Sequence, residues 1–426
     1  MAALTVGGTV RVPGDKSISH RALICAALAD GTSHVRNVLE SADVRSTASV
    51  LRALGVAMPT LGPTIVVNGV GLRGLRTASV PLDCGNSGTT ARLMAGVVAG
   101  HPFTARFTGD ESLSRRPMRR VAKPLEAMGA SVELTGAERL PMTIRGGNLK
   151  PIAWSSDRAS AQVKSAIMFA GLVAGVGVSV SEPERSRDHT ERMLRSLGAD
   201  VRVDGLSVSL GALRSLMALD VDVPADPSSA AFFAALAALA DDGSIDLPGV
   251  CLNPTRTGFL RVLARMGAAV RVVEETERHG EPVGTVRVSP ADLKAVTVTA
   301  QEVPSLIDEL PLVACLAARA DGETQITGAS ELRVKESDRI AAVVANLRSL
   351  GVDADELPDG MRVRGSAGTL RGRIATHGDH RIAMAFGVLG ALPGNEIVVD
   401  DPDCCAVSFP DFWAQLAAAT QPSRRR

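Results

Sequence analysis

Lys16-Ser-Ile-Ser-His-Arg-Ala-Leu-Ile-Cys-Ala-Ala-Leu28 decides the fold of this chain of 426 residues. The stretch opens on polar and cationic side chains, and its second half is apolar on every side. A helix without a polar face is a buried helix. Five more apolar helical runs open on polar or cationic residues, near Asn86, Ala161, Ser228, Pro304 and Asp379. Successive starts lie 67 to 76 residues apart, and this regular period predicts one supersecondary unit copied six times.

A second, amphipathic helical run follows each buried one after 26 to 31 residues. Asp188–Leu197 is an example. Met193, Leu194 and Leu197 are apolar, whereas the charged side chains are expected to face water, namely Glu191, Arg192 and Arg195. These second runs begin near Asp43, Arg116, Arg187, Pro254, Lys335 and Ser408. Several end in a Leu-Gly or Met-Gly pair. A glycine in the left-handed backbone conformation is typical of the position that follows the end of an α-helix. The glycines of these pairs are Gly55, Gly129, Gly198, Gly267 and Gly351.

Short β signals such as Thr64–Val67 and Met361–Val363 fill the gaps between the helical runs, and most of them alternate polar with apolar residues. A chain of this length suits two domains of about 200 residues. We therefore predict an α/β protein with three buried helices in each half, walled by amphipathic helices and small sheets. A doubly wound sheet is excluded because the elements do not follow a regular βαβ alternation.

Composition excludes several classes of partner. Forty-six basic residues balance 46 acidic ones, which argues against a nucleic-acid or membrane-surface partner. The six cysteines contain no C-x-x-C pair, so we expect free thiols in a reducing compartment. The apolar run Ala230–Ala240 is too short to span a bilayer, and Met1–Lys16 has no signal core. We expect a soluble cytoplasmic protein whose tail, Thr420–Arg426, is disordered.

Cations and small hydrogen-bond donors recur at the helix starts, as with Lys16, Asn86, Gln162, Lys335 and Arg381. A helix start offers free N–H groups and a partial positive charge, so it favours anions. Any single cation there has the alternative interpretation of a solvated side chain. A cation at a helix start costs about 0.3–1 kcal/mol, and its repetition at equivalent positions favours a ligand with several anionic groups.

Two carboxylates stand out as a candidate acid–base pair. Asp308 lies in the apolar stretch Pro304–Pro311, which would raise its pKa, and Glu336 lies between Lys335 and Arg339, which would lower its pKa. Such a pair can divide general-base and general-acid work. The alternative is that Asp308 caps or pairs locally and Glu336 is an ordinary i,i+3 partner of Arg339.

The sequence contains no convincing metal or cofactor motif. It has no H-E-x-x-H, and its seven histidines are scattered. Asp400-Asp-Pro-Asp403 lacks the ligand spacing of a calcium loop, and Gly14-Asp-Lys-Ser17 lacks the glycine spacing of a phosphate-binding loop. We therefore expect neither a metal nor a cofactor.

Seven motifs run in order through essentially the whole chain: Pro13-Gly-Asp-Lys-Ser-Ile-Ser-His-Arg-Ala-Leu23, Gly85-Asn-Ser-Gly-Thr89, Arg116-Pro-Met118, Ala159-Ser-Ala-Gln-Val-Lys164, Asn253-Pro-Thr-Arg-Thr-Gly258, Leu332-Arg-Val-Lys-Glu-Ser-Asp-Arg339 and Asp379-His-Arg381. Together they resemble the 3-phosphoshikimate 1-carboxyvinyltransferase (EPSP synthase) family of enolpyruvyl transferases, in the form called class II.

This resemblance implies an activity and an architecture. The family transfers the enolpyruvyl group of phosphoenolpyruvate to the 5-hydroxyl of shikimate 3-phosphate and releases phosphate, in the shikimate pathway of aromatic amino-acid biosynthesis. The implied fold is a two-domain inside-out α/β barrel of six βαβαββ-type units. The implied lobes are residues 14–224 and 225–426, the second completed by residues 1–13. A monomer is implied, and so is glyphosate sensitivity, because Gly88 stands where some class II members carry alanine.

The resemblance also assigns residues. It implies that shikimate 3-phosphate is held by Lys16, Ser17, Arg21, Ser160, Gln162, Arg187, Asp308 and Lys335. It implies that phosphoenolpyruvate is held by Lys16, Gly88, Arg116, Gln162, Arg339 and Arg381. Asp308, with Lys16, would take the 5-hydroxyl proton, and Glu336 would protonate the methylene carbon. Val407 departs from the pattern, because many members carry lysine there to contact phosphoenolpyruvate.

Two alternatives remain open at this point. The sister enolpyruvyl transferase that acts on UDP-N-acetylglucosamine has Lys-Asn where Lys16-Ser17 stands and a cysteine in the loop before its Arg-Pro. The corresponding stretch here, Ser112–Pro117, has no cysteine. A protein from another class, a non-catalytic repeat protein that binds a polyanion, would also explain the cationic helix starts.

Overall fold

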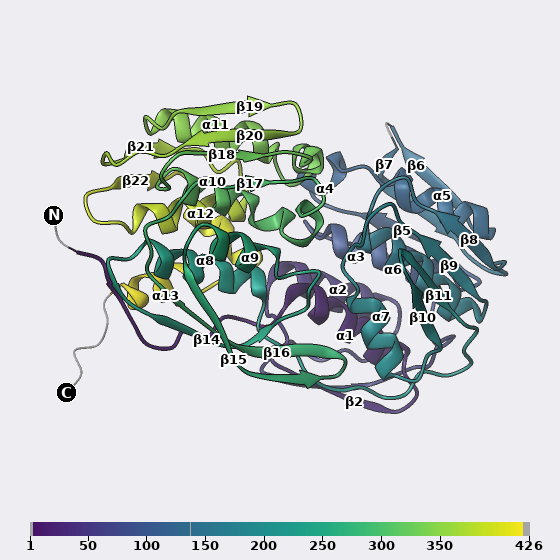
Figure 1. Cartoon of the computed structure of the whole chain (residues 1–426). Helices are drawn as coiled ribbons and strands as arrows, with labels where there is room; N and C mark the ends of the chain where they lie inside the picture. Colours follow the sequence, from purple (N-terminus) through teal and green to yellow (C-terminus); the bar gives the residue numbers. More distant parts are fainter. Residues whose placement is uncertain (1–2, 137, 421–426) are drawn as a thin grey trace. The chain divides into compact units, whose positions relative to one another are not determined.

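The computed structural model describes residues 3–136 and 138–420, so most of the predicted disordered tail lies outside the described residues. The chain is a mixed α/β protein that divides into two compact units (Figure 1). The first lobe is Gly14–Val223 with Arg278–Glu281. The second lobe is Met1–Pro13, Pro224–Glu277 and Pro282–Arg426.

Three buried helices form the core of the first lobe. They are α1 (Lys16–Leu28), α3 (Gly88–Ala99) and α6 (Ala161–Ala174). Helices α3 and α6 lie side by side (Figure 1), and Gly96 allows their backbones to approach. A methyl group at Gly96 would lie 2.1 Å from the carbonyl oxygen of Ala166, so no larger residue fits there.

Amphipathic helices and three small sheets surround this core. The helices are α2 (Ala42–Ala53), the short α4 (Glu111–Arg115), α5 (Arg119–Met128) and α7 (His189–Ser196). The first sheet has the order β12 (Asp220–Asp222), β2 (Thr32–Arg36) and β3 (Thr64–Asn68). The second has the order β4 (Leu82–Asp83), β5 (Thr104–Thr108), β7 (Arg139–Arg145) and β6 (Ser131–Thr135). The third has the order β10 (Val201–Asp204), β11 (Ser207–Leu210), β9 (Val178–Ser181) and β8 (Ile152–Ser155).

The period-2 alternation that predicted half-exposed strands is confirmed in β2 and β3. Buried residues alternate with exposed ones in both strands. The antiparallel register places Val35 opposite Ile65 and Ser33 opposite Val67, so the buried residues of the two strands share one face. That face lies on the helical core, as expected for a sheet with one solvated side.

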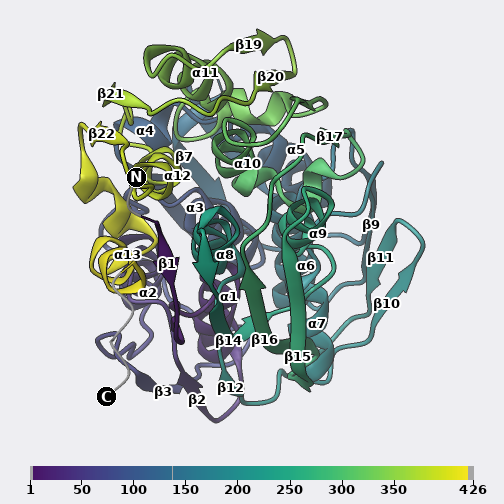
Figure 2. The ribbon, with the colours of Figure 1, turned by 60° about the vertical axis from the view of Figure 1, so that its left-hand side comes forward.

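The second lobe has a corresponding set of helices. Helices α8 (Pro227–Leu239), α10 (Leu310–Ala317) and α12 (His380–Gly390) are buried and pack against one another (Figure 2). Helices α9 (Gly258–Arg265), α11 (Arg339–Ser349) and α13 (Phe412–Ala419) cover them. The ring of Phe412 lies 5.6 Å from that of Phe232 and 5.8 Å from that of Phe409, so a small aromatic cluster packs α13 against α8.

Four sheets complete the second lobe. One has the order β14 (Ile245–Cys251), β16 (Glu281–Ser289) and β15 (Ala269–Arg278). Another has the order β17 (Thr297–Val298), β18 (Glu323–Ile326), β20 (Gly360–Arg364) and β19 (Ala354–Leu357). Two parallel pairs join β21 (Arg371–Ile374) to β22 (Glu396–Val399) and β1 (Thr5–Val6) to β13 (Asp242–Gly243).

The predicted apolar helix at Pro304–Pro311 is wrong in its first half. The chain there forms two 3₁₀ turns, η1 (Val303–Ser305) and η2 (Ile307–Glu309), and α10 begins only at Leu310. Proline is tolerated in the first turn of a helix but clashes with the carbonyl four residues earlier. Pro311 therefore sets the start of α10, and Asp308 lies before the helix rather than inside it.

Prolines also shift other predicted helix starts, whereas the predicted helix ends are confirmed. Arg116 is extended, with φ −79° and ψ 142°, because it precedes Pro117, so α5 begins at Arg119. The 3₁₀ turns η3 (Ser330–Val334) and η4 (Pro402–Val407) precede α11 and α13. All five glycines that were predicted to end helices have positive φ, from +83° to +112°.

None of the described helices combines the length and the apolar character needed to cross a bilayer.

Candidate functional site

In the first lobe, a chain of polar contacts joins the starts of α1, α2 and α3. Lys16, the first residue of α1, places its Nζ 3.1 Å from Asp43 Oδ2 of α2. The Thr90 hydroxyl of α3 lies 2.7 Å from the hydroxyl of Thr47 in α2, which lies 2.7 Å from His20 Nδ1 of α1. These contacts hold three helix N-termini, with their free N–H groups, in one region of the lobe.

Gly88, Arg116 and Gln162 come together around Arg92. Arg92 Nη1 donates to Gln162 Oε1 at 2.6 Å, and Gln162 Nε2 donates to Thr89 Oγ1 at 3.0 Å. A methyl group at Gly88 would lie 2.9 Å from Arg92 Nη1 and 3.4 Å from Arg116 Nη1. Two guanidinium groups therefore flank the start of α3, an arrangement suited to an anion.

Arg92 is a residue that the sequence reasoning missed. The sequence did contain a clue, because Arg92 is the one charged residue in the otherwise apolar run Ala91–Ala95. In the structure, only 5% of its surface is exposed. A buried cation in an apolar helix needs a partner, so its position pointed to a polar site inside the lobe.

Arg21 joins α1 to α6 and α7. Its Nε donates to Thr190 Oγ1 at 2.6 Å, its Nη2 donates to Ser165 Oγ at 2.9 Å, and its Nη1 donates to the carbonyl of Ser17 at 2.8 Å. Burial lowers the pKa of Arg21 to about 10, although the nearby Glu191 raises it. A guanidinium whose charge is poorly solvated gains more from an added anion than one exposed to water does.

Ser160 and Arg187 stand at the starts of α6 and α7, the two helices that Arg21 contacts. The Ser160 side chain caps α6 by accepting from the N–H of Val163, and its own N–H donates to Glu182 Oε1 at 2.7 Å. Arg187 lies just before α7, close enough to lower the pKa of Arg21. Burial is the largest cause of that lowered pKa, and like charge adds to it.

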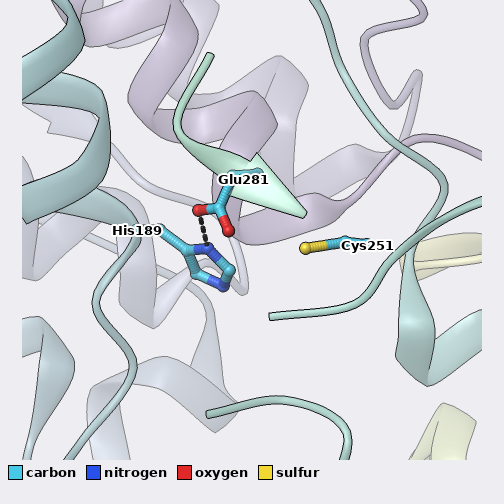
Figure 3. A group of neighbouring side chains, drawn as sticks. All are labelled: His189, Cys251 and Glu281. Atoms are coloured by element: carbon cyan, nitrogen blue, oxygen red, sulfur yellow. Dashed lines mark hydrogen bonds and ion pairs between the residues drawn. The ribbon is translucent and has the colours of Figure 1, made fainter. Parts of the chain in front are cut away.

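A histidine and a glutamate of the first lobe fix the start of α7. His189 Nδ1 donates to Glu281 Oε1 at 2.7 Å, and both side chains are buried (Figure 3). Arg192 Nη1 donates to the carbonyl of Gly280 at 2.6 Å, one helical turn further along. These bonds tie α7, and with it Thr190, to the turn Arg278–Glu281.

The expectation that Glu191 faces water is wrong. Its side chain is only 4% exposed and accepts from Lys164 Nζ at 2.8 Å. Glu182 Oε2 also lies 2.8 Å from Lys164 Nζ. A buried carboxylate needs a paired charge, and Lys164 provides one that the helical periodicity of α7 cannot show.

In the second lobe, Arg339 is the centre of a charged cluster. Its guanidinium is 1% exposed and forms two bonds with Asp379, from Nε at 2.8 Å and from Nη2 at 3.2 Å. Nη2 also donates to Glu336 Oε2 at 2.7 Å. Burial alone would lower the pKa of Arg339, but Asp379 and Glu336 outweigh it and raise the pKa above its ordinary value. Burial likewise raises the pKa of Asp379, but Arg339 holds it below its ordinary value.

Asp308 lies among cations, so its predicted apolar surroundings are wrong. Lys335 Nζ lies 3.3 Å and Arg339 Nη1 lies 3.4 Å from Asp308 Oδ1. Arg381 Nη2 lies 3.8 Å from Asp308 Oδ2. The 3₁₀ turn η2 turns the carboxylate toward these side chains, and a continuous helix would not have placed it in the same way.

The site residues predicted from the resemblance therefore form one cluster in each lobe. The first lobe contains Lys16, Ser17, Arg21, Gly88, Arg116, Ser160, Gln162 and Arg187. The second lobe contains Asp308, Lys335, Glu336, Arg339 and Arg381. Val407, the position that departs from the family pattern, is the half-buried last residue of η4. Asp43 and Asp379 were not predicted as site residues, because their roles appear only through their cationic partners.

Comparison with known proteins identifies the family of the chain. Residues 3–416 match the family model of EPSP synthase (3-phosphoshikimate 1-carboxyvinyltransferase). The chain is 49% identical over 416 residues to the 3-phosphoshikimate 1-carboxyvinyltransferase of Sulfurihydrogenibium sp. (strain YO3AOP1), covering 96% of each protein. It is 48% identical over 419 residues to the enzyme of that name from Aquifex aeolicus (strain VF5), again covering 96% of each.

Solved structures give the same result. The EPSP synthase from Acinetobacter baumannii superposes with a TM-score of 0.87 at 41% identity, covering 98% of this chain and 96% of that one. The enolpyruvyl transferase NikO from Streptomyces tendae has a TM-score of 0.78 at 19% identity, with 98% and 96% coverage, and supports the fold alone. The resemblance drawn from the seven sequence motifs is confirmed, and the chain belongs to the EPSP synthase (3-phosphoshikimate 1-carboxyvinyltransferase) family.

Proposed function

We propose that this chain transfers the enolpyruvyl group of phosphoenolpyruvate to the 5-hydroxyl of shikimate 3-phosphate and releases phosphate. The observation that carries the proposal is the pairing of two carboxylates, Asp308 and Glu336, with one buried guanidinium, that of Arg339. An addition–elimination reaction needs one group that removes a proton and another that delivers one. Family membership supplies the identity of the two substrates.

In the proposed reaction, Asp308, with Lys16, takes the proton of the 5-hydroxyl. The hydroxyl oxygen then bonds to the central carbon of phosphoenolpyruvate, and Glu336 gives a proton to the methylene carbon. The product of this addition is a tetrahedral intermediate that still carries the phosphate. Elimination returns a proton from the methyl group to Glu336 and breaks the carbon–phosphate oxygen bond, and the leaving phosphate takes the proton that Asp308 and Lys16 had removed from the hydroxyl.

The cations are proposed to bind the four anionic groups of the two substrates. Arg116, Arg339 and Arg381, with Lys16, Gly88 and Gln162, would hold phosphoenolpyruvate. Ser17, Arg21, Ser160, Arg187 and Lys335, with Lys16, Gln162 and Asp308, would hold shikimate 3-phosphate. Arginine suits this task because its planar donors form paired bonds with carboxylate and phosphate. Donors held in place before the reaction stabilise developing charge without the cost of reorganising.

The finer description of the fold belongs to the same proposal. Each lobe contains three buried helices that alternate along the chain with amphipathic ones, together with small sheets. This order supports three copies of a βαβαββ-type unit per lobe in an inside-out barrel, with lobe boundaries near residues 13 and 224. We also propose a monomer that acts in the cytoplasm.

The test is phosphate release by the purified full-length chain. With shikimate 3-phosphate and phosphoenolpyruvate together, release should exceed that with either substrate alone, and the product should carry the enolpyruvyl group on the 5-oxygen. Productive replacement of shikimate 3-phosphate by UDP-N-acetylglucosamine would instead assign the chain to the sister activity. Binding of both anions without any turnover would support a non-catalytic binding protein.

A further inference from the structure

Glu309 is a buried carboxylate that the proposed reaction does not use. It follows Asp308 in the turn η2 and is 2% exposed. Its Oε1 accepts two hydrogen bonds, whereas Oε2 is buried and has no hydrogen-bond partner among the described residues. Burying a carboxylate with one unsatisfied oxygen costs free energy. The presence of Glu309 beside the site therefore calls for a functional explanation.

The motif Asn253–Gly258 also has no role in the proposed reaction, and its arginine leads to Glu309. Arg256 Nη2 donates to Ser228 Oγ at 2.8 Å and lies 3.0 Å from Asp226 Oδ1. Ser228 Oγ donates to Glu309 Oε1 at 2.5 Å. Arg381 Nη1 donates to the same oxygen at 3.3 Å. All five side chains belong to the second lobe and are at least nine-tenths buried.

The chemistry of these groups sets the direction of the hydrogen bonds. A guanidinium can only donate, so the Ser228 oxygen accepts from Arg256 and its single proton points elsewhere. That proton is donated to Glu309 Oε1, which must therefore act as an acceptor. Asp226 fixes Arg256 from the other side, and it also caps α8 by accepting from the N–H of Ser228 at 2.8 Å.

The result is a guanidinium that is held at one of its amino groups. Arg381 Nη1 is held by Glu309 Oε1 and by the carbonyl oxygen of Asp308, each at 3.3 Å. The other amino group, Nη2, is left facing the Asp308 carboxylate at 3.8 Å. Without the Glu309 contact, Arg381 could rotate and donate a direct hydrogen bond to Asp308, which would turn the proposed ligand away from phosphoenolpyruvate and add a donor to a carboxylate that already pairs with Lys335 and Arg339.

We infer that Glu309, set by Ser228 and Arg256, is a positioning residue that orients Arg381 toward phosphoenolpyruvate and keeps its contact with Asp308 at the 3.8 Å ion pair, short of a direct hydrogen bond. This inference rests on the proposed function, because it takes Arg381 as a ligand of phosphoenolpyruvate. It gives the motif Asn253–Gly258 a role in the site although none of its side chains needs to touch a substrate.

The first test compares Glu309→Gln with wild type in steady-state phosphate release. The KM for phosphoenolpyruvate should rise at least about 10-fold, because the glutamine oxygen can still accept a hydrogen bond but has lost the negative charge that strengthens it. The KM for shikimate 3-phosphate should stay within about threefold, and kcat should fall because Asp308 gains a direct hydrogen bond from Arg381. Glu302→Gln is the matched control, because it removes a carboxylate of the same segment that pairs with Arg265. Its constants should match wild type.

The second test is a double-mutant cycle that separates orientation from simple loss of packing. Ser228→Ala should change the phosphoenolpyruvate KM in the same direction as Glu309→Gln, and the double variant should be little worse than Glu309→Gln alone. Ser228→Thr keeps the hydroxyl and should restore most of the wild-type KM. If Glu309→Gln does not fold, the phosphoenolpyruvate KM of Ser228→Ala, compared with that of Ser228→Thr, tests the inference.

Two results would overturn the inference while leaving the proposed function intact. One is an unchanged phosphoenolpyruvate KM in Glu309→Gln or, if that variant does not fold, in Ser228→Ala. The other is additive effects of Ser228→Ala and Glu309→Gln. If wild type itself releases no phosphate from the two substrates, the proposed function fails first, and the inference fails with it.

Discussion

At the scale of single residues, the chemistry of this protein depends on which cation each carboxylate faces. Arg339 faces three acidic side chains, Asp308, Glu336 and Asp379. Asp379 holds one edge of the guanidinium with two hydrogen bonds, so it fixes the orientation of Arg339. Of the two proposed acid–base groups, Glu336 accepts from Nη2, which Asp379 also contacts, and Asp308 accepts from Nη1. One buried arginine can in this way align both side chains that are proposed to transfer protons.

Glu336→Gln tests the proposed acid directly. Glutamine keeps the size and can still accept from Arg339, but it has no proton to give to the methylene carbon. We expect turnover to fall by at least about 10²-fold, the usual scale for a lost acid–base group, with substrate binding largely intact. Single-turnover kinetics, together with equilibrium binding of shikimate 3-phosphate, measures the two effects separately.

Glu323→Gln is the control for this substitution, since Glu323 is an exposed carboxylate that pairs with Arg364 at 2.6 Å. It should turn over like wild type. Wild-type turnover in Glu336→Gln would remove Glu336 from the chemistry.

At the scale of elements, buried charges rather than apolar contacts alone align the helices of the first lobe. Lys164 in the first turn of α6 contacts Glu182, which follows β9, and Glu191 of α7, both at 2.8 Å. Burial would lower the pKa of Lys164, but the two glutamates outweigh it and raise the pKa. Glu182 in turn holds the N–H of Ser160 and the hydroxyl of Ser186. The triad therefore fixes the start of α6 relative to α7.

Lys164→Met should destabilise the protein strongly, because it leaves two carboxylates buried without their cation. Breaking a buried pair in this way costs about 3–5 kcal/mol. Urea unfolding at neutral pH, followed by circular dichroism, measures the change in the free energy of unfolding. Adding Glu182→Gln and Glu191→Gln to Lys164→Met should recover part of the loss, since no unpaired charge then remains.

Lys123→Met in α5 serves as the control, because Lys123 is exposed. It should unfold within about 0.5 kcal/mol of wild type. If Lys164→Met changed the free energy of unfolding as little as Lys123→Met does, the triad would contribute little to the alignment of α6 and α7.

At the scale of the whole molecule, buried histidines couple stability to pH. Burial lowers the pKa of His20 well below 6.5, and the neighbouring Lys16 and Arg21 lower it further. The pKa of His101 is also lowered, mainly by burial. In the unfolded chain both histidines take up a proton below about pH 6.5. In the folded chain they resist protonation, so the unfolded state binds more protons in this range.

Stability should therefore fall as the pH drops from about 7.5 to about 5.5. Each histidine contributes at most about 1.4 kcal/mol per pH unit below its unfolded pKa. Carboxylates titrate at lower pH, so this window reports on the histidines. Urea unfolding of wild type and His20→Asn at the two pH values measures the effect, and the variant should lose less stability than wild type. An identical pH dependence in both proteins would exclude His20 as a cause.

The sequence predicted much of the fold because helices and their ends depend on local patterns. The apolar runs at Ala22–Leu28 and Ala230–Ala240 correspond to buried helices, and Gly129 ends α5 with a positive φ as expected. Proline was underestimated: Pro117 and Pro311 delay the starts of α5 and α10. Proline restricts the backbone of neighbouring residues, which is also a local effect, so both delayed helix starts are predictable from the sequence.

The sequence by itself determined the family, the buried helices and the residues proposed to bind substrates, because motifs and periodicities are properties of neighbouring residues. Only the tertiary structure decided which charges meet. It placed Asp308 among Lys335, Arg339 and Arg381, and it joined Ser228 to Glu309 across 81 residues of chain. The physical reason is that a buried charge is stabilised by whichever partner lies within a few ångströms, and that distance depends on how the helices pack.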